Sequence, residues 1–359
     1  MIRAAVFDAP GRPLRIETRP RPVLQPGEAL VRVALCTICG SDLHTIAGRR
    51  QEKTPSVLGH EPVGIVEETH GPLFDVDGEP VGVGDRVVWA VAVSCGACYF
   101  CRRDWPQKCE SLLKYGHEPL QPHVGPLGGL ATHCHLLRGT ALVKVPEGLP
   151  NEVAAPAGCA TATIAAAFRA AGRSMPHCDG GYAVILGLGM LGLTACAWAN
   201  SIGLSVIACD TNDQRLALAS RFGAAHRVKP PELPELVKEI TNGRGADLAL
   251  ELSGSPEAAR SSWEQLRVGG AAVWVGAVFP TAAVALAPEQ LVRRCLTLSG
   301  VHNYTPRDLA AAMAFLAANH SQYPLAELVA RTFPLTQVNE AIAFAERDHP
   351  VRVAVAGPG

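Results

Sequence analysis

The feature that most constrains this chain is a regular alternation of short apolar runs with helix-like segments in its second half. The apolar runs cover residues 182–187, 204–210, 245–253 and 271–276, and the helix-like segments cover 190–202, 213–222 and 256–266. A short, all-apolar run is typical of a strand that is buried on both faces of a parallel sheet. The alternation therefore predicts an α/β unit, a doubly wound parallel sheet with helices on both faces.

A glycine-rich turn lies between the first of these strands and the first helix. Its six residues follow the pattern G-x-G-x-x-G and are Gly187, Leu188, Gly189, Met190, Leu191 and Gly192. The first glycine permits the tight turn, the second lets a pyrophosphate approach the backbone, and the third allows close helix–strand packing. The pattern in this position predicts a dinucleotide site, although such a turn could also serve structure alone.

An acidic residue that would complete such a site stands at the end of the next strand. A carboxylate at Asp210 can accept both ribose hydroxyls of NAD, and it would repel the 2′-phosphate of NADP. Arg215 follows shortly after, and a nearby arginine can support NADP instead. We expect NAD to be favoured over NADP.

The first 160 residues have a different, turn-rich texture. Short runs at 29–35, 64–68 and 85–93 are separated by Pro- and Gly-containing turns and predict a mainly β unit with irregular loops. After residue 300 the pattern changes again. It predicts two helices and a closing strand that return to the first unit, at 306–319, 338–347 and 351–356.

Composition narrows the class of protein. Of 359 residues, 48% are hydrophobic and 18% are charged, as in a folded globular chain. The 32 Lys+Arg against 33 Asp+Glu give a net charge of −1, which predicts neither a nucleic-acid nor a membrane partner. Since neither a signal-peptide pattern nor a membrane-length apolar span is found, we expect a cytoplasmic protein. Its 12 cysteines are too sparse for a disulfide scaffold and need another use.

One group of cysteines has the spacing of a metal site. The four thiols belong to Cys95, Cys98, Cys101 and Cys109. Four thiolates suit a closed, tetrahedral zinc ion that pins an irregular loop, so we expect a structural zinc. An iron–sulfur cluster also uses four cysteines and is the competing cofactor. Unligated core cysteines are the structural alternative.

A second group of potential ligands is scattered along the chain. Cys39 opens the segment C-G-S-D-L-H, His60 and Glu61 lie in G-H-E, and Cys159 follows much later. A catalytic zinc usually takes three protein ligands from distant segments and keeps one position open. Spacing alone leaves a second metal site and ordinary buried side chains as equal alternatives.

The order of these motifs resembles that of the zinc-dependent medium-chain alcohol dehydrogenases, over essentially the whole chain. C-G-S-D-x-H, G-H-E, the four-cysteine loop and the nucleotide turn follow one another as they do in that family. The resemblance implies a GroES-like β domain, residues 1–160 and 300–359, with an inserted Rossmann domain, residues 161–299. It also implies a homo-oligomer, a dimer or a tetramer.

The resemblance also implies roles for individual residues. Cys39, His60 and Cys159 correspond to the ligands of a catalytic zinc, and Glu61 to a carboxylate that can enter as an exchange ligand. Asp42 would orient His60 through its free ring nitrogen, and Ser41 and His44 would relay the substrate's proton to solvent. With the four-cysteine site this makes two zinc ions per subunit. The remaining cysteines are expected to be small apolar fillers, namely Cys36, Cys134, Cys178, Cys196, Cys209 and Cys295.

The implied activity is hydride transfer between an alcohol, or the corresponding carbonyl, and NAD. With only 9 Phe, 5 Tyr and 5 Trp, a pocket for a polar or larger alcohol is at least as well supported as one for ethanol. The segments 106–118 and 154–163 resemble a subgroup linked to phosphonate metabolism, so a hydroxy-phosphonate or a polyol is a candidate substrate. Basic groups near 49–50 and 114–117 could meet such a molecule. The stretch 65–80 departs from the family as a longer polar loop.

Three alternatives to this activity are open. They are a catalytically silent NAD- and zinc-binding protein, an NADP-dependent aldehyde or ketone reductase of the same fold, and a zinc-free quinone or enoyl reductase. Complete ligand sets argue against the zinc-free reductase. Ser41, His44 and Glu61 argue against a silent protein, because NAD binding alone requires none of them.

Overall fold

The structure, a computed structural model, describes residues 1–172 and 180–357, and its contacts divide them into two compact units. Unit 1 comprises Met1–Ala162, Thr305–His320 and Leu325–Gly359, and unit 2 comprises Thr163–Tyr304 and Ser321–Pro324. Unit 2 extends beyond the expected boundary at 300 because β18 (Thr297–Gly300) is the outer strand of its sheet. Residues 321–324 also belong to it, since the Tyr323 hydroxyl donates to Asn200 Oδ1 at 2.8 Å.

Unit 1 is built on a seven-stranded sheet. Its strand order is β12-β8-β5-β3-β20-β19, and β11 pairs with β3. The bounds are β3 (Ala29–Ile38), β5 (Glu61–Thr69), β8 (Arg86–Trp89), β11 (His133–Leu136), β12 (Leu142–Lys144), β19 (Val329–Pro334) and β20 (Arg352–Ala356). The C-terminal strand β20 runs antiparallel to β3 with Val353 opposite Ile38, which brings Arg352 beside the end of β3.

Smaller elements complete unit 1. A three-stranded sheet is formed by β1 (Ile2–Phe7), β2 (Arg15–Arg19) and β4 (Ser56–Val57), and pairs are formed by β6 (Leu73–Phe74) with β7 (Pro80–Val81) and by β9 (Ala92–Val93) with β10 (Leu113–Lys114). The helices are α1 (Gly40–Ile46), α2 (Asn151–Ala154), α9 (Pro306–Asn319) and α10 (Val338–Asp348). The stretch 65–80, expected as a polar loop, is thus partly regular, because β5 continues to Thr69 and a short strand pair follows.

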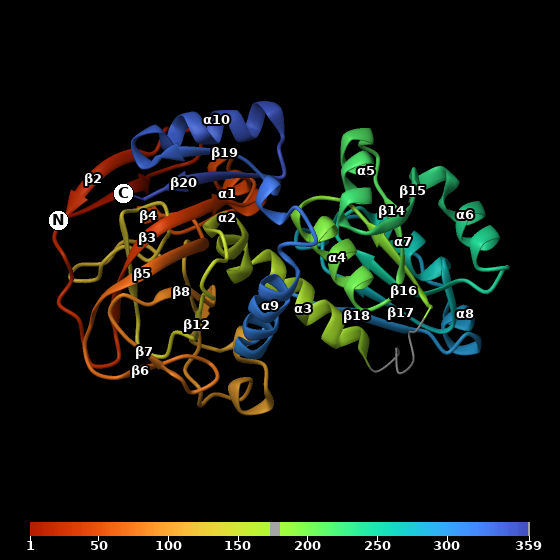
Figure 1. The fold of residues 1–359 in the computed structure, drawn as a ribbon, viewed down its shortest axis with the longest axis horizontal. Helices are drawn as coiled ribbons and strands as arrows, with labels where there is room; N and C mark the ends of the chain where they lie inside the picture. The colour runs from red at the N-terminus through yellow and green to blue at the C-terminus, as the bar shows by residue number, and fades with distance from the viewer. Residues whose placement is uncertain (173–179, 358–359) are drawn as a thin grey trace. The chain divides into compact units, whose positions relative to one another are not determined.

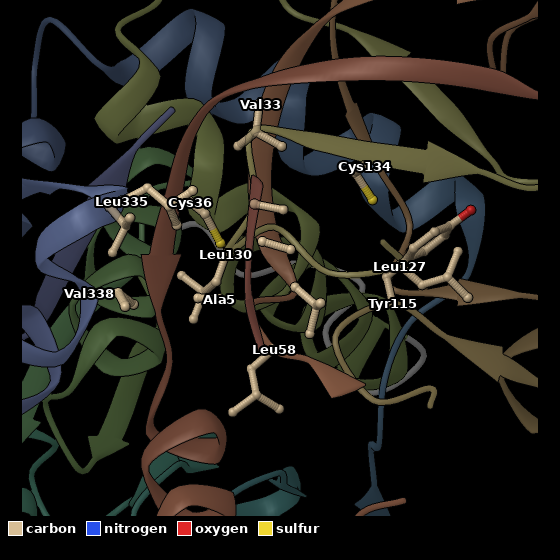
Figure 2. Packing of buried hydrophobic residues seen from close by; sticks show 14 of the residues in the cluster. Ala5, Val33, Cys36, Leu58, Tyr115, Leu127, Leu130, Cys134, Leu335 and Val338 are labelled. Atoms are coloured by element: carbon tan, nitrogen blue, oxygen red, sulfur yellow. The ribbon is translucent and has the colours of Figure 1, made fainter. Parts of the chain in front are cut away.

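The core of unit 1 joins residues from distant parts of the chain. Cys36 on β3, Leu58, Leu130 and Val338 at the start of α10 belong to one buried cluster (Figure 2). The C-terminal segment is therefore part of this core, not a tail attached to it. The C-terminal strand β20 is thereby fixed beside β3, where the candidate site begins.

Unit 2 contains a parallel sheet of the order β15-β14-β13-β16-β17-β18 (Figure 1). The bounds of the strands are β13 (Tyr182–Leu186), β14 (Ser205–Cys209), β15 (Ala224–Val228), β16 (Ala246–Glu251) and β17 (Leu266–Trp274). The helices are α4 (Met190–Ser201), α5 (Asp213–Ala219), α6 (Leu233–Ile240), α7 (Pro256–Glu264) and α8 (Pro288–Arg293), preceded by α3 (Ala160–Ala171), which belongs to unit 2 from Thr163 onward. This is the doubly wound order of a dinucleotide-binding fold, and it confirms the predicted fold class.

Two elements of unit 2 lack a clear signal in the sequence. Strand β15 reads Ala-Ala-His-Arg-Val and exposes its middle residues, so it lacks the all-apolar run of its neighbours. Helix α6 begins at Leu233, after a short 3-10 turn at Pro230–Glu232, and its second residue is also a proline, so the sequence gives no clear signal for its start. Across the described residues, no single helix is both long and apolar enough to cross a membrane. One bent pair, 151–158 with 160–171, meets that test by length and composition only.

Candidate active site

Cys39 lies where the central strand of unit 1 passes into a helix. It is the N-cap residue of α1, and Asp42 in the first turn accepts the Cys39 N–H through Oδ2 at 2.8 Å. The other oxygen, Oδ1, accepts the Gly59 N–H at 3.2 Å. Asp42 is 1% exposed and so ties together, from within, the two segments that carry Cys39 and His60.

The structure places Asp42 beside the ring of His60. His60 Nδ1 lies 3.4 Å from Asp42 Oδ1, which is an ion-pair distance, although the contact is not aligned as a regular hydrogen bond. The same carboxylate also accepts the backbone N–H groups of Cys39 and Gly59. Asp42 is thus placed to act on His60 both at the ring and through the backbone of the preceding residue, and its orienting role stays a prediction.

Four side chains from three distant segments converge at this point. One ligand atom each from Cys39, His60, Glu61 and Cys159 lies within 4.8 Å of all the others. Cys159 is placed there by the junction between a short 3-10 turn (Ala155–Gly158) and α3. In a tetrahedral zinc site, ligand atoms lie about 3.5–3.8 Å apart, given Zn–S of about 2.3 Å and Zn–N of about 2.0–2.1 Å. Two thiols and an imidazole with this spacing fit zinc.

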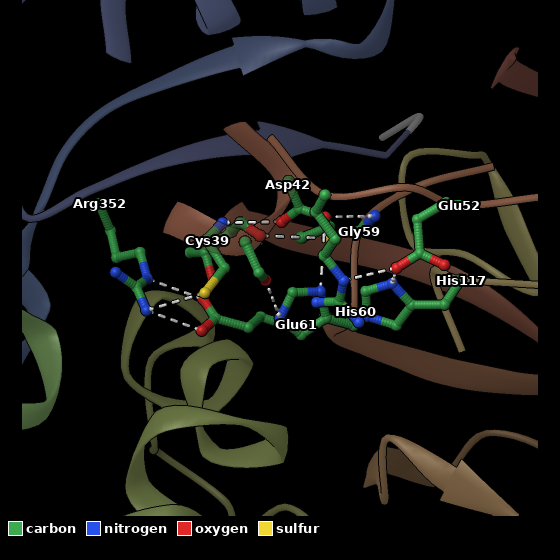
Figure 3. Close-up of polar contacts among 12 residues, drawn as sticks. Cys39, Asp42, Glu52, Gly59, His60, Glu61, His117 and Arg352 are labelled. Carbon is green, nitrogen blue, oxygen red and sulfur yellow. Dashed lines mark hydrogen bonds and ion pairs between the residues drawn. The ribbon is translucent and has the colours of Figure 1, made fainter. Parts of the chain in front are cut away.

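Glu61 is held by a buried arginine that the sequence did not point to. Arg352 donates from Nε to Glu61 Oε2 and from Nη2 to Oε1, both at 2.9 Å, while Thr37 Oγ1 donates to Oε2 at 2.6 Å. Arg352 Nη2 also lies 3.6 Å from Cys39 Sγ (Figure 3). Glu61 is fully buried and Arg352 is 7% exposed. Entry of Glu61 into a metal shell stays a prediction, and it would require this fork of hydrogen bonds to open.

The same contacts control ionisation within the cluster. A hydrogen bond with Cys159 lowers the pKa of the Cys39 thiol well below its ordinary value, and Arg352 and His60 add to the effect against the opposing influence of burial. Burial lowers the pKa of Arg352, but Glu61 and the Cys39 thiolate raise it further, so the guanidinium stays charged. The cluster therefore contains a thiolate that is stabilised before any cation arrives.

The two residues of the predicted relay lie on α1. Ser41 Oγ is 3.3 Å from His60 Nε2, and His44 is half-buried one turn later. Burial, helped by Arg49, lowers the pKa of His44 below its ordinary value. Neutral imidazole, the form that can accept a proton, is therefore favoured at neutral pH.

The four-cysteine loop also closes on itself. The sulfurs of Cys95, Cys98, Cys101 and Cys109 lie within 4.8 Å of one another, with Cys98–Cys101 at 3.5 Å and Cys95–Cys101 at 4.0 Å. A tetrahedral zinc thiolate site needs sulfurs about 3.8 Å apart. The backbone N–H groups of Ala97 and Cys98 lower the pKa of Cys95 to about 6. The donor set and its spacing fit a closed zinc site.

Each glycine of the nucleotide turn meets a different steric demand. Gly187 has φ +93° and abuts Ser253, and a Cβ at Gly192 would lie 1.9 Å from the Gly187 carbonyl oxygen. At Gly189, the N-cap of α4, nothing lies within 4 Å of such a Cβ, so the backbone is open to a ligand. These environments match the three roles expected of the pattern.

The remaining residues of the expected cofactor site also flank this turn. Leu188 and Met190 are buried and Leu191 is half-buried, so the turn offers a ligand mainly its backbone. Asp210 accepts the Leu188 N–H at 2.6 Å through Oδ2 and the Asn212 N–H at 2.8 Å through Oδ1. Each carboxylate oxygen keeps a second acceptor position. Arg215 is half-buried on α5.

The other cysteines behave mostly as expected of apolar fillers. Cys36, Cys134, Cys196 and Cys209 are buried. Cys295 is exposed and has φ +50°, so its assignment as a filler is wrong: it sits in the turn between α8 and β18, outside the core. Cys178 lies outside the described residues.

A β unit with one open and one closed ligand cluster, together with a doubly wound nucleotide sheet, defines a class of zinc-containing oxidoreductases. The family model of the alcohol dehydrogenase GroES-like domain matches residues 25–147, and that of the zinc-binding dehydrogenases matches 191–318. An alcohol dehydrogenase from Geobacillus stearothermophilus is 30% identical over 345 residues, which cover 94% of both chains. The 5-exo-hydroxycamphor dehydrogenase of Pseudomonas putida is 29% identical over 344 residues, 91% of this chain and 92% of that one.

A solved structure extends the likeness to three dimensions. The alcohol dehydrogenase from Thermotoga maritima has a TM-score of 0.91 and 29% sequence identity, with 99% of each chain covered. The chain belongs to the zinc-dependent medium-chain alcohol dehydrogenase family. It is accordingly an oxidoreductase of the alcohol dehydrogenase type.

Proposed function

We propose that the protein oxidises a polar primary or secondary alcohol with NAD+, and reduces the corresponding carbonyl in reverse, at a zinc ion held by Cys39, His60 and Cys159. The observation that carries this proposal is the convergence of two thiols and an imidazole within 4.8 Å, beside a serine on α1. A zinc-free reductase of the same fold has no need of such a set.

The preference for NAD rests on Asp210. Its carboxylate is aimed at the glycine turn by the Leu188 and Asn212 N–H groups, and its remaining acceptor positions suit two ribose hydroxyls. A 2′-phosphate in the same place would meet a buried negative charge, since Asp210 is 8% exposed. Arg215, half-buried on α5, is the residue through which NADP could instead be accommodated.

Residues of this chain would bind the metal ion and carry away the proton of the alcohol hydroxyl. When bound, the zinc ion lowers the pKa of an alcohol oxygen toward neutrality, and NAD+ accepts the hydride. Cys39, His60 and Cys159 would hold the ion, and three protein ligands would leave a position for the substrate oxygen. Ser41 Oγ would accept the alcohol proton while giving up its own hydroxyl proton, and neutral His44 would take up the relayed proton and release one to solvent. Arg352 keeps Glu61 charge-balanced while this happens.

The second, four-thiol cluster is proposed to hold a structural zinc, which makes two ions per subunit. We also propose a homo-oligomer. Within the described part of the chain, β18 pairs with β17 alone and is the outer strand of its sheet, and Val278 and Val292 nearby in sequence are 57% and 72% exposed.

Metal analysis combined with NADH formation across an alcohol panel tests the proposal. We expect two zinc ions per subunit, and one ion with loss of alcohol oxidation in Cys39→Ser and His60→Ala. NAD binding by these variants should be unchanged, because unit 2 is intact. Retained NAD-linked oxidation after loss of that zinc would refute the mechanism. A preference for NADP would refute the role of Asp210 alone.

A further inference from the structure

A second histidine lies beside His60 and has no part in the mechanism above. His117 is 8% exposed, and its ring centroid lies 5.1 Å from that of His60, with the ring planes at 30°. The close contact between the two histidines depends on Gly116, because a Cβ at this position would lie 3.1 Å from both the Gly59 carbonyl oxygen and the His60 Cβ. The turn that carries His117 is thus packed directly against the segment that carries the candidate ligand.

One ring nitrogen of His117 faces an acidic side chain. Glu52 Oε1 lies 3.1 Å from His117 Nδ1 (Figure 3). The same oxygen lies 2.6 Å from Arg50 Nε. The contact to the ring is bent from ideal hydrogen-bond geometry, but the carboxylate still favours the proton on Nδ1. In that tautomer Nε2 is a hydrogen-bond acceptor. No residue within 1–172 or 180–357 hydrogen-bonds to this nitrogen.

Two other histidines of unit 1 show what a purely structural pair looks like. His133 contacts Glu67 through Nε2 at 3.0 Å and Thr132 Oγ1 through Nδ1 at 2.9 Å. His135 contacts Glu28 through Nε2 at 2.9 Å, and its Nδ1 accepts the Gly125 N–H at 3.2 Å. Both of these rings have both nitrogens satisfied by the protein. His117 has the same kind of glutamate partner but keeps one nitrogen unused.

We propose that His117 is a specificity-determining residue whose Nε2 accepts a hydrogen bond from a second hydroxyl on the substrate, close to the reacting carbon. Glu52 and Arg50 are the positioning residues that hold the ring in place. The inference rests on the proposed function, because it concerns the substrate carbon next to the one that carries the reacting hydroxyl. It names the substrate as an alcohol with a second hydrogen-bond donor, such as a vicinal diol, in preference to a simple aliphatic alcohol.

The test compares two substrates that differ by one hydroxyl, 1,2-propanediol and 1-propanol. A site built to bind a hydroxyl discriminates against the analogue that lacks it, so we expect kcat/KM to favour the diol by about tenfold or more. His117→Leu should bring this ratio close to one, mainly by raising KM for the diol, with zinc content unchanged. His133→Leu, which breaks a glutamate–histidine pair of the structural kind, is the matched control and should keep the ratio.

A binding measurement separates this inference from the proposed function. In zinc-loaded protein with 15N-labelled histidine, the Nε2 resonance of His117, assigned with His117→Asn, should shift with 1,2-propanediol and not with 1-propanol. Glu52→Gln should weaken that chemical-shift change, and it provides an independent test if His117→Leu folds poorly. A ratio near one in the wild type, a ratio unchanged in His117→Leu, or a silent Nε2 resonance would overturn the proposal. Absence of oxidation of any alcohol would instead overturn the proposed function, and the resonance would still report on His117.

Discussion

Replacing Arg352 by methionine tests whether the buried ion pair organises the metal site. The change removes both hydrogen bonds to Glu61 and the contact with Cys39 Sγ, while a side chain of similar length keeps most of the packing. Glu61, with no exposed surface, is then left as a buried carboxylate with Thr37 as its remaining side-chain donor. Breaking a buried pair from one side costs about 3–5 kcal/mol.

The double variant distinguishes this cause from lost packing. Glu61→Gln removes the buried charge, so Arg352→Met with Glu61→Gln should recover about 1–3 kcal/mol of the loss. In urea unfolding of unit 1, we expect the free energy of unfolding to be highest for the wild type, lower for the double variant and lowest for Arg352→Met. This can be followed by tryptophan fluorescence in a background where the other four tryptophans are replaced by phenylalanine, so that the emission reports on Trp89 in the core of that unit.

Zinc affinity gives a second measurement on the same variants. Arg352 is one of the groups that stabilise the Cys39 thiolate, so its loss should raise the pKa of that thiol and weaken zinc binding. A competition titration against a chelator measures the change. Two results would refute this reasoning. One is a free energy of unfolding of Arg352→Met within about 0.5 kcal/mol of the wild type, a difference typical of neutral surface changes. The other is a double variant that is no more stable than Arg352→Met alone.

Three further predictions concern the relay, the structural thiols and the nucleotide turn. His44→Gln should slow alcohol oxidation chiefly below pH 7, where solvent bases are scarce, with both zinc ions retained; an equal loss at pH 9 would contradict the relay. In zinc-free protein the rate of Cys95 alkylation should rise with pH around an apparent pKa of about 6. Cys101, whose pKa is raised to about 11, should stay unreactive at neutral pH. Bound zinc should protect both thiols from alkylation. Gly189→Ala should fold normally but lose NAD affinity, while Gly192→Ala should also destabilise unit 2, because its Cβ would collide with a backbone carbonyl at 1.9 Å; equal stability of the two variants would contradict the assigned roles.

The sequence predicted those features that are encoded locally. The glycine turn could be assigned because three short-range steric demands fall within six neighbouring residues. The four-thiol loop could be assigned because its members lie within one short segment. Strand β15 was not predicted because it is an edge strand of its sheet. Two of its middle residues, His226 and Arg227, are polar, and they interrupt the apolar run by which the other strands were recognised.

Features that depend on distant pairing could not be read in this way. Arg352 stands in a closing strand whose pattern shows one basic residue among apolar ones, which is usually a solvent-facing position. Only the register of β20 on β3, with Val353 opposite Ile38, turns that arginine toward Cys39 and Glu61. The alternating pattern of a strand predicts which side chains share a face. It does not predict that Arg352 on one face of β20 will meet Glu61, which lies 291 residues away in the sequence.

The buried arginine also explains how a carboxylate can stand next to two thiolates without opposing cation binding. Two thiolates balance the charge of one zinc ion, and a third anion in the same low-dielectric site would be costly unless it were paired. Arg352 supplies that pairing through two hydrogen bonds of 2.9 Å, so Glu61 adds no net charge to the cluster. The ion pair therefore lets Glu61 remain next to the candidate metal position. Its role as an exchange ligand stays a prediction, and the two hydrogen bonds to Arg352 would have to open before Glu61 could bind the ion.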